Sequence, residues 1–132
     1  MKAITILEPW ATLICEGKKT VETRNWDTEY RGKILIHASK RAMPDKQYED
    51  YLVDNFIEHE LHRGCIIGEV ELVDIIPFGQ ALEQIILNKD IVNYCTVEFG
   101  SQFAWIFKNA KIYDNPIPTK GSLGLWEYKK ET

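Results

Sequence analysis

The chain has 132 residues, of which 45% are hydrophobic and 27% are charged, and such values are typical of one globular domain, predicted here over residues 1–132. No apolar run approaches the ~20 residues that cross a bilayer, and the first residues lack the features of a signal peptide. Three widely spaced cysteines, Cys15, Cys65 and Cys95, indicate reduced thiols rather than a disulfide framework. We therefore expect a cytoplasmic protein that does not enter a membrane.

The net charge of −4 is unevenly distributed along the chain. Residues 1–41 carry eight Lys or Arg against five Asp or Glu, and residues 101–132 carry five against three, whereas residues 42–100 carry three against twelve. If the two basic ends line one cleft, that cleft suits a phosphate-bearing ligand or a short single strand. A strong duplex binder needs a broader basic surface. The alternative is that these charges are scattered over a solvated surface.

The N-terminal region predicts a strand followed by a short helix. Residues 2–7 alternate weakly and are β-branched, which favours a strand. Pro9 suits the first turn of a helix over about residues 9–16, and Gly17 is the residue type that commonly follows a helix end. Trp10 lies on the apolar stripe of this helix, so we expect it in the core.

A second strand is predicted over residues 19–26. The two-residue period of a strand places Glu22, Arg24 and Trp26 on one face. Lys19 has the opposite parity, so it can reach the same ligand only from the turn before the strand or from a bulge.

The remaining elements follow from hydrophobic periodicity and turn residues. We predict strands over residues 33–38, 65–78, 103–107, 109–118 and 124–128, helices over residues 45–62 and 80–87, and a loop over residues 89–102. The strands do not alternate with crossover helices, which argues against a parallel, doubly wound sheet. The predicted fold class is α+β, a small, mostly antiparallel β-barrel with two or three helices packed outside.

The polar cluster in residues 17–26 is the main candidate site. Arg24 can bind phosphate through two hydrogen bonds and Lys19 as a point charge, while Glu22 can accept hydrogen bonds from a base edge or act as a general base. Trp26 offers a ring for stacking on a base. The alternative is a solvated strand on which Glu22 pairs with Arg24.

Other cations follow turns or strand ends, where loops often carry binding groups. Arg31, Lys40 and Lys120 are predicted to contact the ligand, and Arg41 follows the same strand end as Lys40. His37 lies inside a predicted strand, and such a histidine is more often a hydrogen-bonded sheet residue than a catalytic one.

Two histidines, His59 and His62, are spaced to share a face of the predicted helix over residues 45–62. They lack the zincin spacing and further ligands, so we expect no metal and no cofactor. The same helix has an acidic outer face that includes Glu49, which leaves a protein-interaction domain as another hypothesis.

The order of these motifs resembles the ASCH domain family of the PUA-like superfamily. The family motif Gly-x-Lys-x-x-Glu-x-Arg matches at its four fixed positions, Gly17, Lys19, Glu22 and Arg24. Flanking similarity runs over nearly the whole chain, at Pro9-Trp10-Ala11, Arg31-Gly32, Ile36-His37-Ala38, Gly68-Glu69-Val70, Ala104-Trp105, Pro118-x-Lys120-Gly121 and Leu125-Trp126. The resemblance implies a PUA-like β-barrel that binds single-stranded RNA or a nucleotide in a cleft lined by Lys19, Glu22 and Arg24.

The resemblance also implies an enzymatic alternative. Some compact bacterial members hydrolyse the amide of an N4-acylated cytidine with the motif Lys, a Thr and a Glu further along, and others are linked to ribonuclease activity. Here Glu22 stands where those members have Thr, and Glu98 is a candidate for the downstream Glu. This departure argues against copying the deacylase chemistry, although Lys19 and Glu22 could still activate water. Binding is therefore the leading expectation, and hydrolysis is the alternative.

Overall fold

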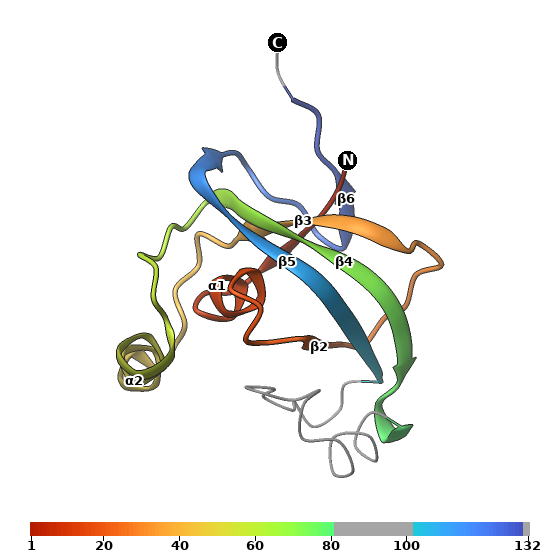
Figure 1. The fold of residues 1–132 in the computed structure, drawn as a ribbon, viewed down its shortest axis with the longest axis horizontal. Helices are drawn as coiled ribbons and strands as arrows, with labels where there is room; N and C mark the ends of the chain where they lie inside the picture. The colour runs from red at the N-terminus through yellow and green to blue at the C-terminus, as the bar shows by residue number, and fades with distance from the viewer. Residues whose placement is uncertain (81–101, 131–132) are drawn as a thin grey trace.

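The computed structural model describes residues 1–80 and 102–130 (Figure 1). The described part contains β1 (Lys2–Ile6), α1 (Trp10–Cys15), β2 (Val21–Arg24), β3 (Gly32–Ala38), α2 (Lys46–Phe56), β4 (Cys65–Pro77), β5 (Phe103–Pro118) and β6 (Leu125–Glu127). The six strands form one sheet in the order β2-β5-β4-β3-β1-β6. Only β1 and β3 pair in parallel, and the other neighbours are antiparallel. The predicted α+β class with a curled, mostly antiparallel sheet is confirmed.

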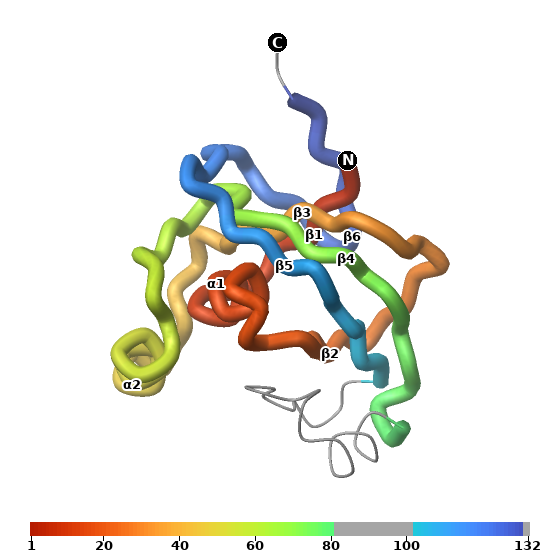
Figure 2. Tube along the Cα trace, in the orientation of Figure 1, coloured from red at the N-terminus to blue at the C-terminus, as the bar shows by residue number. Residues whose placement is uncertain are grey.

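The main core lies between the sheet and α1. Alternation along β3 directs Ile34 and Ile36 into this core with Ile14 of α1, whereas Leu35 packs in a second cluster on the opposite face. α1 contacts β3, β4 and β5, and the sheet curls beside it (Figure 2). The two faces of β3 therefore pack in different clusters.

Bulges interrupt the regular alternation of side chains along β4 and β5. The register shift between Ile66 and Gly68 places Ile66 in the second cluster and Ile67 in the main core, so simple alternation from Val70 fails. The strands predicted over residues 103–107 and 109–118 are one strand, β5, in which Asn109 has a positive φ of 54°. The backbone of β5 is irregular at Asn109 but stays paired in the sheet, and the sequence pattern alone predicts a strand end at this point.

α2 stands apart from the sheet (Figure 1) and is shorter than predicted. The Asp45 side chain caps its first turn by accepting from the Tyr48 amide at 3.0 Å. The helix ends at Phe56, so the predicted end at residue 62 is wrong. Glu49 was expected on the outer face, but its side chain is buried and pairs with Arg63. Helical spacing alone cannot distinguish a carboxylate that is buried with an arginine partner from one that is exposed on the surface.

Some predictions fall on residues outside the described ranges. These are Cys95, Glu98, nearly all of the helix over residues 80–87 and of the loop over residues 89–102. Within the described ranges, Cys15 and Cys65 are free thiols. No helix there is both long and apolar enough to span a membrane.

Candidate functional site

The turn between α1 and β2 places the motif strand. Gly17 has a φ of 79°, which glycine adopts without strain, and its amide donates to the Ile14 carbonyl at 3.0 Å. The amides of Lys18 and Lys19 then both donate to the Leu13 carbonyl. The predicted glycine after the helix is confirmed, and it directs the chain into β2.

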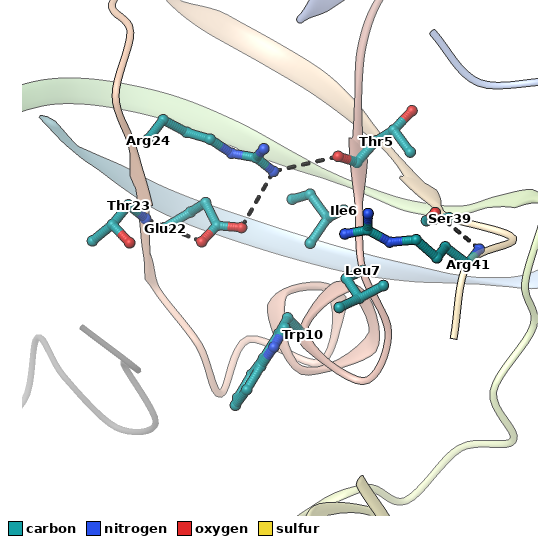
Figure 3. Close-up of a pocket in the computed structure, with 9 residues that line it drawn as sticks. All are labelled: Thr5, Ile6, Leu7, Trp10, Glu22, Thr23, Arg24, Ser39 and Arg41. Atoms are coloured by element: carbon teal, nitrogen blue, oxygen red, sulfur yellow. Dashed lines mark hydrogen bonds and ion pairs between the residues drawn. The ribbon is translucent and has the colours of Figure 1, made fainter. Parts of the chain in front are cut away.

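A cavity of about 330 Å³, here called the seam pocket, opens between β1, β2, the start of α1 and the loop after β3 (Figure 3). Its volume falls in the ~300–1,000 Å³ range of small-molecule sites. The lining residues are Thr5, Ile6, Leu7, Trp10, Glu22, Thr23, Arg24, Ser39 and Arg41.

Arg24 connects two strands that are far apart in the sheet order. Its Nη2 atom donates to the Thr5 carbonyl of β1 at 3.3 Å and lies 3.5 Å from Glu22 Oε2 (Figure 3). The other Glu22 oxygen accepts from the Thr23 amide at 3.0 Å. The buried Nε atom of Arg24 has no hydrogen-bond partner among the described residues. Glu22 and Arg24 are therefore the partly exposed residues of β2 at the pocket, while Val21 and Thr23 are buried.

Lys19 lies behind Glu22 rather than on the wall of the seam pocket. Only 1% of its side chain is exposed. Its Nζ atom donates to the Val21 carbonyl at 2.6 Å and lies 3.9 Å from Glu22 Oε1. It is also 5.7 Å from the centre of the Trp10 ring. Lys19 precedes the first residue of β2, so it reaches Glu22 from the turn.

The two tryptophans near the motif differ in their relation to the seam pocket. Trp10 packs against the main core, as expected, but it also lines the seam pocket, which the sequence interpretation missed. Trp26 lies beyond the end of β2 and packs edge-to-face on Trp105, with ring centres 4.7 Å apart. It does not line the seam pocket. The alternation that groups Trp26 with Arg24 fails because the strand has already ended.

A second cavity of about 310 Å³, here called the loop pocket, adjoins the seam pocket through two shared wall residues, Thr5 and Ser39. Its other lining residues are His37, Lys40, Thr119, Lys120, Gly121, Ser122 and Leu123. The loop pocket thus brings together Lys40 and Lys120, which are 80 residues apart in the chain.

His37 forms part of the wall of the loop pocket and has partners for both ring nitrogens. Nε2 lies 2.7 Å from the Thr119 carbonyl, and Nδ1 lies 3.2 Å from the Thr5 hydroxyl, which also accepts from Trp126 Nε1 at 3.1 Å. The carbonyl can only accept, so Nε2 carries a proton and donates. The prediction of a hydrogen-bonded sheet histidine is confirmed.

The remaining predicted residues lie at different places. Arg41 is exposed and lines the seam pocket. Arg31 lies outside both pockets, where it donates to the Thr28 carbonyl at 2.8 Å and is 3.8 Å from Asp74. Thr5 and Ser39 were missed, because a threonine in a strand and a serine after one carry no signal that separates them from ordinary surface residues.

The histidines considered for a metal site lie after the end of α2, so they do not share a helix face. His59 Nδ1 is 2.5 Å from Glu16 Oε2, and this contact connects the segment after α2 to the end of α1. Residues 1–80 and 102–130 contain no group of three or more His, Cys, Asp or Glu that could hold a metal ion.

Comparison with known proteins identifies the family. The model of the ASCH domain family matches residues 4–118. The chain belongs to the ASCH domain family. ASCH domains have a PUA-like fold that is associated with RNA binding.

Similar proteins fall into two groups. Activating signal cointegrator 1 from Mus musculus and from Homo sapiens are each 30% identical over 132 residues, covering 94% of this chain and 22% of the relative. The chain thus spans about a fifth of these relatives. The crystal structure of ASCH from Zymomonas mobilis has a TM-score of 0.57 at 17% identity and covers 89% of this chain and 72% of that one. A mutant of that protein gives a TM-score of 0.57 at 18% identity, covering 89% of this ASCH chain and 74% of the mutant. At such identity the likeness shows the fold alone.

Proposed function

We propose that this ASCH domain binds RNA or a nucleotide in the seam pocket. The observation that supports this most is the convergence of Arg24 and Arg41 on one cavity beside Glu22 and Trp10. Guanidinium groups bind phosphate, the carboxylate accepts hydrogen bonds from a base or ribose, and the indole ring packs on a base.

The charges around the pocket favour an anionic ligand. Glu22 is flanked by Lys19 at 3.9 Å and Arg24 at 3.5 Å, so the one carboxylate in the wall is more than neutralised. Arg41 adds a further positive charge, and its side chain has no hydrogen bond or ion pair with the described residues. Because the pocket is partly shielded from water, these charges act more strongly there than on an open surface.

Arg24 is also prepared for a ligand by its own hydrogen bonds. Nη2 holds the guanidinium against the Thr5 carbonyl and Glu22, while Nε lacks a partner in the described part of the chain. The Arg24 side chain is 27% exposed, so a phosphate or carbonyl oxygen in the pocket would contact the accessible part of the guanidinium. A pre-positioned donor loses little side-chain freedom on binding.

The binding experiment compares two arginines in the wall of the seam pocket with one arginine outside it. Calorimetric titration with uridine 5′-monophosphate and a ten-nucleotide single-stranded RNA is run on the wild type, Arg24→Gln, Arg41→Ala and Arg31→Ala. Loss of a charge-assisted contact should weaken binding roughly 10–100-fold for Arg24→Gln and Arg41→Ala. Arg31→Ala, which removes the same charge outside the pocket, should bind like the wild type. Equal affinities for all four proteins would overturn the proposal.

A second candidate function, hydrolysis of an N4-acylated cytidine or of RNA, is favoured by one observation. The Glu22 carboxylate lines the pocket 3.9 Å from the Lys19 ammonium, and a carboxylate in a pocket wall is a group that can serve as a general base. The test is incubation of the wild type and Glu22→Gln with N4-acetylcytidine and with labelled RNA. Turnover by the wild type alone supports hydrolysis. If the wild type and Glu22→Gln both showed only background turnover, the hydrolysis proposal would be rejected and the binding proposal would be unaffected.

A further inference from the structure

The two pockets are neighbours that share part of their walls. Ser39 and Thr5 line both cavities, and the Ser39 amide donates to the Ile6 carbonyl at 2.9 Å, which fixes the boundary against β1. The Ser39 hydroxyl accepts from the Arg41 amide at 3.1 Å, so its own proton is still able to donate to a ligand. A ligand in the seam pocket can therefore continue past Ser39 into the loop pocket.

The loop pocket supplies positive charge that the fold does not otherwise use. Lys40 and Lys120 are both exposed, and neither ammonium has a hydrogen bond or ion pair with the residues that the structure describes. The stem of Lys40 lies close over Gly64, where an added Cβ would be 2.9 Å from Lys40 Cγ and Cε. Packing on Gly64 thus holds the Lys40 stem at the loop pocket, while its ammonium group remains free to contact a ligand.

The loop that forms the far wall is firmly attached. The Thr119 amide donates to the Gly64 carbonyl at 3.2 Å, and its carbonyl accepts from His37 at 2.7 Å. The backbone at Gly121 packs directly on the wall, since an added Cβ there would lie 2.6 Å from Thr5 Oγ1. Leu123 at the rim is 99% exposed and offers an apolar surface. A fixed wall with an ammonium and an apolar contact suits a second base and its phosphate.

Charge also determines the direction in which a strand would leave the seam pocket. On the side of Trp10 the neighbouring ring is Tyr48 of α2, at 6.1 Å, and the exposed surface of that helix carries Asp50 and Asp54. Lys46 pairs with Asp50 at 3.2 Å, so the exposed surface of this helix offers no unpaired cation that would attract a phosphate backbone. The opposite direction leads to Lys40 and Lys120, which attract it.

We infer that the loop pocket is a second nucleotide subsite, so that the preferred ligand is a single strand of at least two nucleotides rather than a free mononucleotide. This inference rests on the proposed function of the seam pocket. The phosphodiester passes the shared wall at Ser39, within the field of Arg41 and Lys40, and the second base lies against the loop of residues 119–123.

The test compares uridine 5′-monophosphate with the 5′-phosphorylated dinucleotide pUpU by calorimetry on the intact chain. The dinucleotide should bind the wild type about tenfold more tightly, the effect of one further base contact and one further phosphate. Lys40→Ala/Lys120→Ala should remove this advantage and leave the affinity for the mononucleotide unchanged. Lys108→Ala/Lys111→Ala removes the same charge from exposed β5 positions outside both pockets and should keep the advantage.

The outcomes separate the two proposals. The second subsite would be overturned if the wild type bound the two ligands equally, or if the Lys40→Ala/Lys120→Ala protein still bound the dinucleotide more tightly. In both cases, binding of the mononucleotide would leave the seam-pocket proposal standing. If neither ligand bound, both the second subsite and the seam-pocket proposal would be overturned. An advantage lost equally in the Lys108→Ala/Lys111→Ala control would show a general effect of charge and would also count against the subsite.

Discussion

Lys19 carries its charge in a position where 1% of the side chain is exposed. An ammonium group so placed must be satisfied within the protein, and it is, by the Val21 carbonyl at 2.6 Å and Glu22 at 3.9 Å. The motif lysine therefore holds the start of β2 and orients the carboxylate that faces the pocket. We interpret its part in the site as positioning Glu22.

Lys19→Met tests this structural part. The substitution removes the hydrogen bond to the Val21 carbonyl and one of the two cations beside Glu22, so the free energy of unfolding should fall by about 2–4 kcal/mol. Urea denaturation followed by tryptophan fluorescence measures it. Lys108→Met, at an exposed position, should change stability by no more than about 0.5 kcal/mol. A Lys19→Met protein as stable as the wild type would show that the buried ammonium does not support the fold.

Glu8 gives a pH dependence with a defined sign. Burial raises the pKa of its carboxyl, and hydrogen bonds from the Thr12 hydroxyl and amide and the charge of Arg63 offset this only in part. The folded protein therefore holds the proton more tightly than the unfolded chain. Stability should fall as the pH rises from the ordinary value of 4.5 through the raised pKa.

Glu8→Gln removes this titration and can keep both contacts with Thr12, which are 2.8 Å and 2.6 Å long. Urea denaturation between about pH 4 and 7 should show the wild type losing stability relative to the variant as the pH rises. Glu29→Gln, at an exposed position, should track the wild type. A difference that is flat, or that grows toward acid pH, would contradict the raised pKa.

Sequence reasoning at the level of residues places Glu22 and Arg24 on a common face, but it misses that Trp10 lines the pocket and wrongly groups Trp26 with Arg24. The first pair lies inside β2, where the two-residue period fixes a common face. Trp26 lies two residues after the strand ends, and Trp10 begins a helix whose position over the pocket depends on the tertiary fold. Periodicity describes residues within an element and says little about those at its ends.

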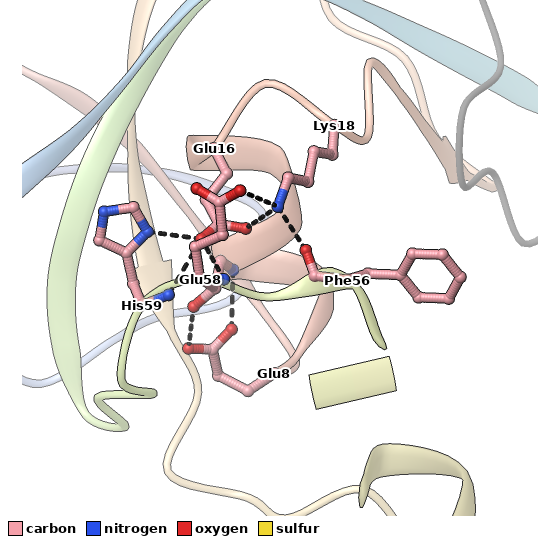
Figure 4. A network of polar contacts seen from close by, with 7 residues as sticks. Glu8, Glu16, Lys18, Phe56, Glu58 and His59 are labelled. Atoms are coloured by element: carbon pink, nitrogen blue, oxygen red, sulfur yellow. Dashed lines mark hydrogen bonds and ion pairs between the residues drawn. The ribbon is translucent and has the colours of Figure 1, made fainter. Parts of the chain in front are cut away.

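Among the elements, α2 depends most on contacts beyond its own sequence. Only Glu49 and Leu52 of this helix are buried. The segment after it is connected to α1 by Glu16, whose carboxylate accepts from the amides of residues 58 and 59 at 3.0 Å and 3.2 Å (Figure 4). Lys18 adds a hydrogen bond to the Phe56 carbonyl. The position of α2 beside Trp10 therefore rests on a few polar contacts.

Glu16→Ala removes the hydrogen bonds that the Glu16 carboxylate accepts from the amides of residues 58 and 59. Amide exchange in α2 and in residues 57–59 should become about tenfold faster, a change of about 1.4 kcal/mol in the opening free energy, because little apolar burial holds the helix. Exchange in β4 and β5 should be unchanged. Hydrogen exchange measured by mass spectrometry compares the variant with Glu60→Ala, an exposed neighbour. Unchanged exchange in α2 would show that Leu52 and the Glu49–Arg63 pair hold it without Glu16.

The long strands show why element boundaries are the weaker part of a sequence-based prediction. Strand positions in β1, β3 and β6 agree with prediction within one or two residues, because glycine, proline and polar turns border them. β5 was predicted as two strands because the register shifts of its pairing with β4 interrupt the alternation. A bulge preserves pairing while it breaks the pattern from which pairing is predicted.

At the scale of the whole molecule, the site forms where the curl of the sheet brings β2 close to β1. β2 and β1 are separated by three strands in the sheet order, yet Arg24 of β2 donates to the Thr5 carbonyl of β1. No local pattern predicts this contact, because it requires the parallel pairing of β1 with β3 and the curl of the sheet. The resemblance to the family predicted the cleft beside the motif strand, while the residues opposite, Thr5, Ser39 and Arg41, come from the fold. That residues 1–132 fold as one unit stays a prediction.

The most direct test of the central proposal is amide chemical-shift mapping of the ¹⁵N-labelled protein during titration with uridine 5′-monophosphate. The seam pocket predicts that the largest concentration-dependent shifts fall on the amides of Thr5, Glu22, Arg24, Ser39 and Arg41. Shifts centred on Arg31 and Asp74 outside the pocket, or no shifts at millimolar nucleotide, would contradict it.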